Sequence, residues 1–249
     1  MPRRADETAL AKTHESVITK IVLNKNQIKE RKVTVKIAIN EQKPEHLRVS
    51  WEGQYEVFSH FEFVCGIPSA LFAIGTYKKN GKPNVCFHAW SSFQGEGDGY
   101  YVILAGISKN CHTYKNVLRD KSFTVNFLSK DYYDALIKTI FHNKDEDNEF
   151  LAGGFTAGKA ETVNAPVIEE SFLTLECEFV EARDLFPGSR TALILGKAKR
   201  AVLEDSHAHG VDKKYGPEGF MFNIHSPIDL KTGEGEVSAV ATMKIEKLT

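Results

Sequence analysis

The sequence is poor in cysteine, and its few cysteines do not form the pattern of a disulfide framework or a zinc site. Disulfide-rich domains and zinc sites carry cysteines at short, repeated spacings. Most of the cysteines here lie among apolar residues of expected strands, where cysteine packs as a small hydrophobic side chain. We therefore expect a reducing, cytoplasmic environment. The four cysteines in 249 residues are Cys65, Cys86, Cys111 and Cys177.

Long apolar runs and an excess of one charge are also missing. No stretch approaches the roughly 20 apolar residues of a membrane-spanning helix. The basic start Met-Pro-Arg-Arg lacks the apolar core of a secretory signal. The 32 basic and 33 acidic residues give a formal charge of −1, which argues against nucleic acid as the main partner. We expect no membrane and no nucleic-acid partner, while a small anionic ligand at a local site stays possible.

The chain does contain many short apolar or alternating segments that are joined by turns. Alternation with a period of two predicts strands, and two segments with helical spacing, at 116–120 and 131–141, predict short helices. Because strands outnumber helices, we predict a mainly β barrel, closed so that few sheet edges are exposed. The predicted strands are Arg31–Asn40, Leu47–Trp51, Tyr55–Phe58, Ser69–Tyr77, Asn84–Trp90, Tyr100–Ala105, Ser122–Leu128, Leu173–Glu181, Ala192–Val202 and Gly219–Ile224.

Several segments are expected to lie outside the barrel. Residues 1–30 are polar and Lys-rich, and predict a partly ordered arm or an extra helix. Residues 94–99 are Gly-rich and predict a loop. The acidic run His142–Glu149 is expected to be a solvated loop, and His207-Ala208-His209 a surface loop with no metal. We assign residues 1–55 to an N-terminal extension, a polar arm plus added strands, and residues 56–249 to the main domain.

One candidate site lies in the turn between a strand and a helix at residues 106–116. Asn110 is the expected N-cap of a helix that begins near Cys111. The first N–H groups of a helix are unpaired and favour an anion, and Ser108, Lys109 and Thr113 add hydroxyl donors and a positive charge. The turn is either a small phosphate site or an ordinary helix start. Cys111-His112 resembles an activated thiol, but sequence neighbours need not form a pair in space.

A second polar cluster lies on the strand before this turn. His88, Trp90, Ser91 and Ser92 combine aromatic groups with hydroxyl groups. Such a strand could line a flat aromatic ligand and bind its polar edge. The other interpretation is a strand end with Trp90 in the core.

The order of these segments resembles the flavin reductase-like, FMN-binding split-barrel family, and its flavoredoxin branch in particular. The resemblance covers about residues 60–205. It implies a mainly β fold, an FMN-binding split β-barrel of Greek-key type with a few short helices. It also implies a homodimer with FMN near the subunit interface. The segments that carry it include Asn80–Val85, Trp90–Phe93, Ser108–Asn116, Phe123–Asn126, Leu151–Thr156, Ala165–Glu170 and Leu195–Ala198.

The resemblance also implies a role for individual residues. The segment Asn84–Phe93 would run beside the isoalloxazine ring and ribityl chain, and the turn Ser108–Thr113 would hold the 5′-phosphate. Lys109 and Thr113 would be the main phosphate ligands, and Asn126 would bond either the cofactor or the backbone. The segment 186–190 lacks a histidine that many relatives carry, so their substrates do not carry over. The full predicted set is Asn84, His88, Ala89, Trp90, Ser91, Ser92, Ser108, Lys109, Cys111, His112, Thr113 and Asn126.

These features predict an FMN-dependent oxidoreductase that passes electrons from NAD(P)H, or from a protein donor, to a flavin or another acceptor. The alternatives are an FMN-containing electron-transfer protein that works with a redox protein partner, and a non-enzymatic split barrel that binds haem or another cofactor. No catalytic residue is predicted, because the hydride and electron chemistry would belong to the flavin. A Gly-x-Gly-x-x-Gly fingerprint is missing, but nicotinamide can dock over a flavin without one.

Overall fold

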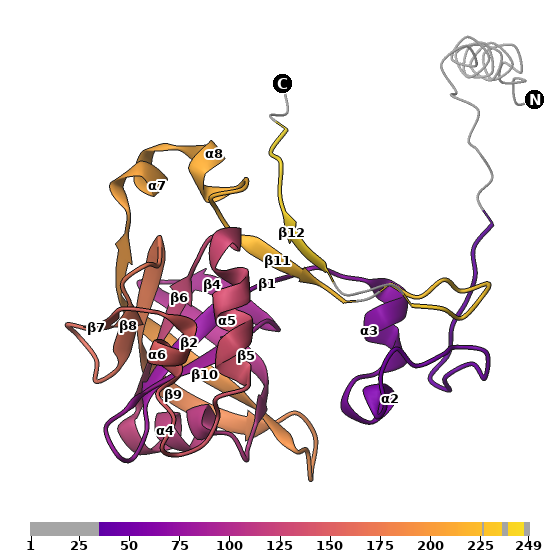
Figure 1. The fold of residues 1–249 in the computed structure, drawn as a ribbon, viewed down its shortest axis with the longest axis horizontal. Coiled ribbons are helices and arrows are strands. Elements are labelled where there is room, and N and C mark those ends of the chain that lie inside the picture. Colours follow the sequence, from indigo (N-terminus) through magenta and orange to yellow (C-terminus); the bar gives the residue numbers. More distant parts are fainter. Residues whose placement is uncertain (1–34, 226, 236–238, 247–249) are drawn as a thin grey trace, which may run out of the picture. The chain divides into compact units, whose positions relative to one another are not determined.

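The structure, a computed structural model, describes residues 35–225, 227–235 and 239–246 (Figure 1). The chain divides into two units, Met1–Lys43 and Pro44–Thr249. In the first unit the described residues, 35–43, form neither helix nor strand. The predicted arm at 1–30 lies outside the described residues. The described part of the strand predicted at Arg31–Asn40 does not form one, so that prediction was wrong for residues 35–40.

The second unit is built on an antiparallel sheet of seven strands in the order β3-β2-β6-β9-β10-β5-β4. The central strands are covered on both faces, and every residue of β6 is buried, including its polar residues Ser122, Thr124 and Asn126. The sheet confirms the predicted mainly β fold and most of its strands. The strands are β2 (Phe72–Tyr77), β3 (Pro83–His88), β4 (Ser91–Glu96), β5 (Gly99–Ser108), β6 (Ser122–Phe127), β9 (Leu173–Asp184) and β10 (Thr191–Leu203).

The sheet curls until its two edges approach each other. Phe72 of β2 and Phe93 of β4 stand far apart in the strand order, yet their ring centroids are 5.8 Å apart. Ala89 and Trp90 connect the two edge strands, β3 and β4, and the Ala105 N–H donates to the Trp90 carbonyl at 2.9 Å. The sheet therefore forms the split barrel that the sequence predicted.

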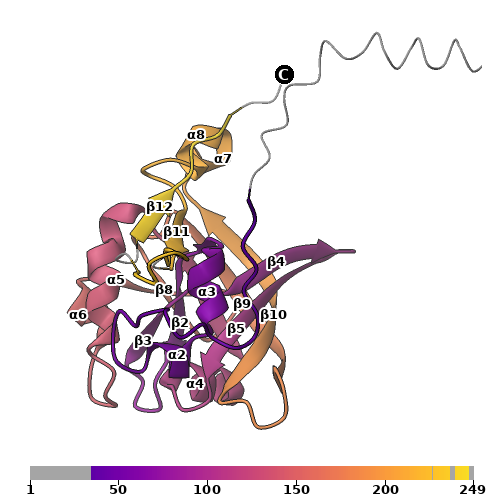
Figure 2. The same ribbon diagram turned by 90° about the vertical axis from the view of Figure 1, so that its right-hand side faces the viewer.

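Two apolar clusters lie on opposite faces of β2, as the period of two requires. Phe72 and Ile74 point into the barrel, where they meet residues of β5, β6, β9 and β10. Ala73 lies in a second cluster that includes Leu136 of α5 (Tyr133–Ile140) and Phe150 of α6 (Glu149–Gly153). Figure 2 shows these two helices together against one side of the sheet.

The helix α4 (His112–Asp120) connects β5 to β6 and places its first turn beside β3. The buried Val117 anchors it in the barrel core. The remaining described elements are α7 (Asp205–His209), α8 (Val211–Lys214), the hairpin β7 (Ala157–Lys159) with β8 (Pro166–Ile168), a 3-10 turn at Lys130–Tyr132, and a sheet of β1 (Ser69–Ala70), β11 (Met221–Ile224) and β12 (Ala239–Thr242). No helix in the described ranges is long and apolar enough to cross a membrane.

The segment before the barrel is helical, and the strands predicted at Leu47–Trp51 and Tyr55–Phe58 were wrong. Residues 47–51 form neither helix nor strand, and α2 (Gln54–Val57) and α3 (His60–Cys65) follow them. Tyr55 and Phe58 are three residues apart, which puts them on one side of a helical turn. With Phe63, they pack against the small cluster around Leu47 and Ile228.

Three loop predictions also need correction. The Gly-rich stretch predicted as a loop at residues 94–99 is mostly the β4–β5 hairpin, whose tight turn contains Gly97 at φ 56°. Glu149, assigned to a solvated loop, is 1% exposed at the start of α6. His207, assigned to a surface loop, is buried and stacks on Phe172 at 4.4 Å between ring centroids.

Candidate functional site

A small pocket lies between the edge strand β3, the first turn of α4 and the end of α5. Its volume is about 180 Å³. It brings together four residues of the predicted site, which are separated by up to 29 positions in the sequence. They are Asn84, Cys111, His112 and Thr113.

Asn84 and Thr113 form the buried centre of this pocket. The Asn84 Nδ2 donates to Thr113 Oγ1 at 3.1 Å and to Thr76 Oγ1 at 3.2 Å, and both Asn84 and Thr113 are 2% exposed. Asn116 donates to the same Thr76 oxygen at 3.1 Å. Because Thr113 Oγ1 accepts from Asn84, its own O–H can donate, and within the protein it does so toward Cys86. The pair therefore holds one hydroxyl donor in a fixed position beside the start of α4.

Cys111 is the N-cap of α4, so the prediction that Asn110 caps this helix was wrong. The Cys111 Sγ accepts from the Tyr114 N–H at 3.4 Å. Burial raises the pKa of the Cys111 thiol, although the Tyr114 and Thr113 N–H groups oppose the shift. Burial also raises the pKa of Cys86 to about 12, and the neighbouring Cys111 adds to the effect. Both cysteines are therefore neutral thiols at physiological pH.

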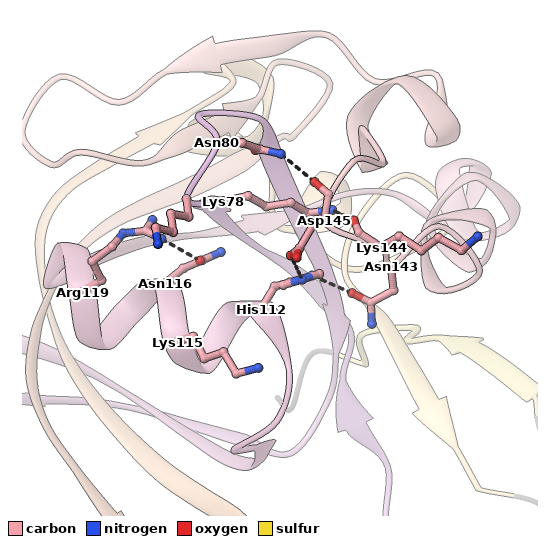
Figure 3. A pocket seen from close by; sticks show the side chains of 10 residues that line it. Lys78, Asn80, His112, Lys115, Asn116, Arg119, Asn143, Lys144 and Asp145 are labelled. Atoms are coloured by element: carbon pink, nitrogen blue, oxygen red, sulfur yellow. Dashed lines mark hydrogen bonds and ion pairs between the residues drawn. The ribbon is translucent and has the colours of Figure 1, made fainter.

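His112 does not form an activated pair with Cys111. Its Nδ1 lies 3.0 Å from Asn143 Oδ1 and its Nε2 lies 2.8 Å from Asp145 Oδ1 (Figure 3). Both ring nitrogens are therefore engaged with the loop between α5 and α6. This contact places His112 at the mouth of the pocket and fixes its ring.

Native-state alkylation of the protein with iodoacetamide at pH 7.5 is expected to modify Cys65 first. Cys65 is exposed, whereas Cys86 and Cys111 are protonated and partly covered. Peptide mass spectrometry over a time course measures the order of modification. Faster labelling of Cys111 than of Cys65 would restore the activated-thiol interpretation.

A buried ion pair fastens the loop between α5 and α6, which borders the pocket at Asn143. Lys78 Nζ lies 3.0 Å from Glu149 Oε1, and both side chains are 2% exposed. The Lys78 ammonium also donates to the carbonyls of Lys144 and Asp147 at 2.6 and 3.0 Å. The other Glu149 oxygen accepts from the Val85 N–H at 2.6 Å. Burial raises the pKa of Glu149, which the bonds from Lys78 and Val85 oppose.

The predicted residues His88 and Ala89 have structural roles at the end of β3. The His88 Nε2 lies 2.9 Å from the Ala105 carbonyl, and the ring meets Phe72 at 5.7 Å between centroids. Ala89 is 5% exposed in the second apolar cluster. Burial lowers the pKa of His88 to about 4, so its ring is neutral at physiological pH.

His88 is expected to make the protein acid-sensitive. Its folded pKa is lower than its unfolded value of about 6.5, so the unfolded state binds the proton more readily. The free energy of unfolding should therefore decrease by up to ~3 kcal/mol as the pH falls from 6.5 to 4. Urea titrations of wild-type protein and His88→Gln test this, and the variant should lack this part of the pH slope. Parallel pH profiles would contradict it.

Trp90 and the two serines that follow it line the junction of the sheet edges. Trp90 has φ 21°, which is strained for a residue with a side chain, and its ring stacks on His225 at 5.4 Å and 17°. The Ser91 Oγ is buried and has no hydrogen-bond partner. Ser92 is exposed on β4. Trp90 is therefore packed, while Ser91 keeps an unused donor.

The structure does not bring Lys109, Ser108 or Asn126 into the pocket. The Lys109 ammonium pairs with Asp184 Oδ1 at 2.5 Å, and the Lys109 backbone N–H donates to the Arg190 carbonyl. Ser108 is exposed, and its hydroxyl accepts from the Asn110 N–H at 3.4 Å. These residues lie on the side of the turn that faces the β9–β10 hairpin.

Asn126 is fully buried, and its side chain is used within the protein. Its Nδ2 donates to the Ala73 carbonyl and to Thr124 Oγ1, at 3.3 and 2.9 Å. Its Oδ1 accepts from the Ile168 N–H and the Thr174 hydroxyl, both at 3.1 Å. Because both donors and both acceptor positions are filled, the geometry favours the backbone role over a cofactor contact.

Some pocket residues were missed by the sequence reasoning. Thr76, which does not line the pocket but accepts from Asn84, faces Asn84 across the β2–β3 hairpin, a pairing that the Asn80-Gly81 turn could have suggested. Thr139 of α5, Glu149 of α6 and Asn143 of the loop between these helices also line the pocket. No local pattern indicates that a charge in an acidic run is buried against a lysine some 70 residues earlier.

Comparison with known proteins identifies the family. Residues 65–217 match the model of the flavin reductase like domain, which is more than half of the chain. The protein therefore belongs to the flavin reductase-like family, as the sequence resemblance indicated. This membership places it in a flavin-related class of oxidoreductases with a split-barrel fold.

Individual relatives are distant. A protein of Aquifex aeolicus (strain VF5) is 28% identical over 145 residues, 56% of this chain and 71% of its own. The flavoredoxin of Desulfovibrio vulgaris (Miyazaki F) has a TM-score of 0.58 at 16% identity, over 72% of this chain and 90% of that one. Nitrilotriacetate monooxygenase component B from Bacillus cereus has a TM-score of 0.64 at 14% identity, over 87% and 100%. An FMN-binding protein from Thermus thermophilus has a TM-score of 0.60 at 15% identity, over 86% of this chain and 99% of that one. At these identities the structures establish the shared fold.

Proposed function

We propose that the protein is an FMN-dependent oxidoreductase whose cofactor lies along β3, with its phosphate at the first turn of α4. The observation that carries this proposal is the pocket formed by Asn84, His112 and Thr113 in a chain of the flavin reductase-like family. The pocket lies between the start of α4, which favours an anion, and β3. The chain continues from β3 to Trp90 and Ser91.

The residues present fit an FMN molecule at both ends of this strand. At the α4 end, Thr113 offers a buried hydroxyl donor that Asn84 positions at 3.1 Å. At the other end, the buried Ser91 hydroxyl lacks a partner, which is costly for a polar atom unless a ligand supplies one. The polar edge of an isoalloxazine ring carries suitable acceptors. An unpaired donor beside the aromatic Trp90 is what a flat, polar-edged ligand requires.

The chain's part in the reaction is to bind and orient the cofactor. Bound FMN supplies the hydride and electron chemistry. Thr113 and the α4 start bind the phosphate, and the buried ion pair Lys78–Glu149 holds the loop between α5 and α6 in place. Trp90, backed by His225 and Phe58, forms a rigid wall where the sheet edges meet. His88 is neutral and bonded to Ala105, so it does not act as a general acid there.

We further propose that NAD(P)H is the electron donor, that a flavin or another small molecule is the acceptor, and that the protein is a cytoplasmic homodimer with FMN near the interface. These assignments go beyond the family membership itself. Size-exclusion chromatography with light scattering measures the oligomeric state.

Anaerobic titration of the FMN-loaded protein with NADH and then NADPH tests the proposed activity. We expect loss of the flavin absorbance at about 450 nm with one of the two donors. Bleaching only by a reduced ferredoxin-like protein would instead identify an electron-transfer protein. A haem Soret band with no flavin absorbance would identify the non-enzymatic alternative.

A further inference from the structure

Two segments outside the matched flavin reductase like domain pack together near Trp90. They are residues 47–64 and the described residues of 225–235. Phe63 and Ile228 join them in one apolar cluster, and the Ile228 N–H donates to the Phe63 carbonyl at 3.3 Å. What these segments contribute near Trp90 is therefore an addition to the matched domain.

The two segments place aromatic rings against Trp90. His225 stacks on the Trp90 ring at 5.4 Å between centroids and at an angle of 17°, and Phe58 lies at 5.4 Å and 38°. Phe63 in turn contacts the His225 ring at 5.6 Å between centroids. Trp90 has φ 21°, a strained conformation that persists only where the surrounding structure holds it. The stacked His225 ring is part of that surrounding structure.

His225 has two polar neighbours on the same ring nitrogen. Its Nε2 lies 3.2 Å from Asn223 Nδ2 and 3.7 Å from Glu62 Oε2. Because the Asn223 amide nitrogen can only donate, the Nε2 accepts, and the neutral ring carries its hydrogen on Nδ1. In this state Glu62 Oε2 is buried without a hydrogen-bond partner in the described ranges. One nitrogen therefore faces a donor that needs a neutral ring and a carboxylate that needs a protonated ring.

Protonation of His225 reverses the choice between these two neighbours. The protonated Nε2 can no longer accept from Asn223, and it donates to the Glu62 carboxylate instead. The positive charge then also lies against the face of the Trp90 ring, where a cation is attracted to the aromatic system.

The charged and titratable groups near this contact come from two elements. Glu62 comes from α3 and is the ion-pair partner of His225 within the described ranges. His88 comes from β3 and contacts Trp90 at 5.9 Å between ring centroids, but burial keeps its pKa low and its ring neutral. The other neighbours of the His225 ring that the structure describes carry no charge; they are Phe58, Phe63 and Asn223.

Burial determines the pH range in which the contact changes. It lowers the pKa of His225 below the usual value of 6.5, so the ring is neutral at physiological pH and is protonated in acid. Burial raises the pKa of Glu62, and a bond from the Ser59 N–H opposes that shift. The two groups therefore titrate as one coupled pair in mildly acidic solution.

We propose that Glu62 and His225 form a pH-dependent contact that controls the position of Trp90. When neutral, His225 accepts from Asn223 and stacks on Trp90. When protonated, it bonds to Glu62, ties α3 to this stack and places a positive charge against Trp90. Glu62 and His225 are thus positioning residues, which act on a ligand at the junction of the sheet edges through Trp90. The contact does not require the flavin, so it goes beyond the proposed function.

Trp90 fluorescence as a function of pH tests the contact directly. The chain contains two tryptophans, so Trp51→Phe leaves Trp90 as the single emitter. Because a protonated imidazole quenches a tryptophan ring that it contacts, we expect one loss of Trp90 emission between pH 7.5 and 5, centred below about 6.5. Circular dichroism at each pH shows that the chain stays folded over this range.

Variants in this background assign the loss of emission. His225→Gln should abolish it, and Glu62→Gln should lower its midpoint by roughly one pH unit, because the imidazolium loses the adjacent carboxylate. The matched control is His207→Gln, since His207 is also buried, stacked on an aromatic ring and 3.2 Å from a glutamate. It should leave the loss unchanged. His88→Gln should also leave it unchanged, because His88 is protonated only near pH 4.

Constant Trp90 emission over this range, or a loss that persists in His225→Gln, would overturn the proposal. Should His225→Gln not fold, Glu62→Gln decides, and an unchanged midpoint in that variant would overturn the proposal as well.

The consequence for the cofactor rests on the proposed function. Trp90 is the wall proposed for the isoalloxazine ring, and a positive charge held against Trp90 favours reduced, anionic flavin over oxidised, neutral flavin. The pH dependence of FMN reduction in acid should therefore differ between wild type and His225→Gln. If emission behaves as expected and the two pH dependences are equal, the contact stands and the proposed placement of the flavin fails.

Discussion

Thr113→Val is expected to weaken FMN binding by about 10- to 100-fold and to change riboflavin binding little. The Thr113 hydroxyl is buried and held by Asn84 at the start of α4, where a phosphate would compete with Cys86 for its proton. A hydrogen bond to a charged group is worth about 1.5–3 kcal/mol, and each 1.4 kcal/mol corresponds to a tenfold change in affinity. Riboflavin has no phosphate, so it does not use this donor. Quenching of flavin fluorescence measures both affinities.

Three further variants sharpen this result. Thr113→Ser retains the hydroxyl and should bind FMN almost as wild type does. Lys109→Ala alone should have a smaller effect than Thr113→Val, because the Lys109 ammonium is held by Asp184. The combined Lys109→Ala/Thr113→Ala variant should lose FMN strongly. Equal losses of FMN and riboflavin would show that this turn does not hold the phosphate.

Lys78→Met is expected to lower the free energy of unfolding by about 3–5 kcal/mol. The substitution leaves the Glu149 carboxylate buried without its cation, and it removes the donor to the Lys144 and Asp147 carbonyls. An uncompensated buried charge costs more than a lost surface contact does. Urea denaturation followed by circular dichroism gives the change, and FMN affinity should decrease as the loop between α5 and α6 loosens.

The control for this prediction is the double variant Lys78→Met/Glu149→Leu, which removes both charges. Buried pairs replaced by apolar residues often keep their stability. Here the recovery should be partial, because the Val85 N–H still loses its acceptor. A change below about 1 kcal/mol for Lys78→Met alone would show that the pair is less buried or less coupled than the structure indicates.

The barrel was largely predictable because its strands carry local signals. The apolar run at 72–77, the Asn80-Gly81 turn and the return strand at 83–88 determine a hairpin with few alternatives. The segment at 54–58 was not predictable in the same way. Its aromatic residues fit a strand by alternation, but they pack against Leu47 and against Ile228, which is distant in sequence.

The site was predictable only in part, for a similar reason. Asn84 and Thr113 were named from the family resemblance, and the structure places them in contact. Lys109 was expected beside Thr113, but its pairing with Asp184 depends on the β9–β10 hairpin, which follows much later in the chain. His225 reaches Trp90 from beyond the end of the matched domain, so no single stretch of the sequence indicates their contact.

Titration of the purified, flavin-free protein with FMN tests the central claim most directly. Flavin fluorescence and equilibrium dialysis together give the affinity and the number of sites. The account predicts saturable binding of one FMN per chain, tighter than that of riboflavin because the α4 start and Thr113 bind the phosphate. Failure to bind FMN, or equal affinity for FMN and riboflavin, would contradict it.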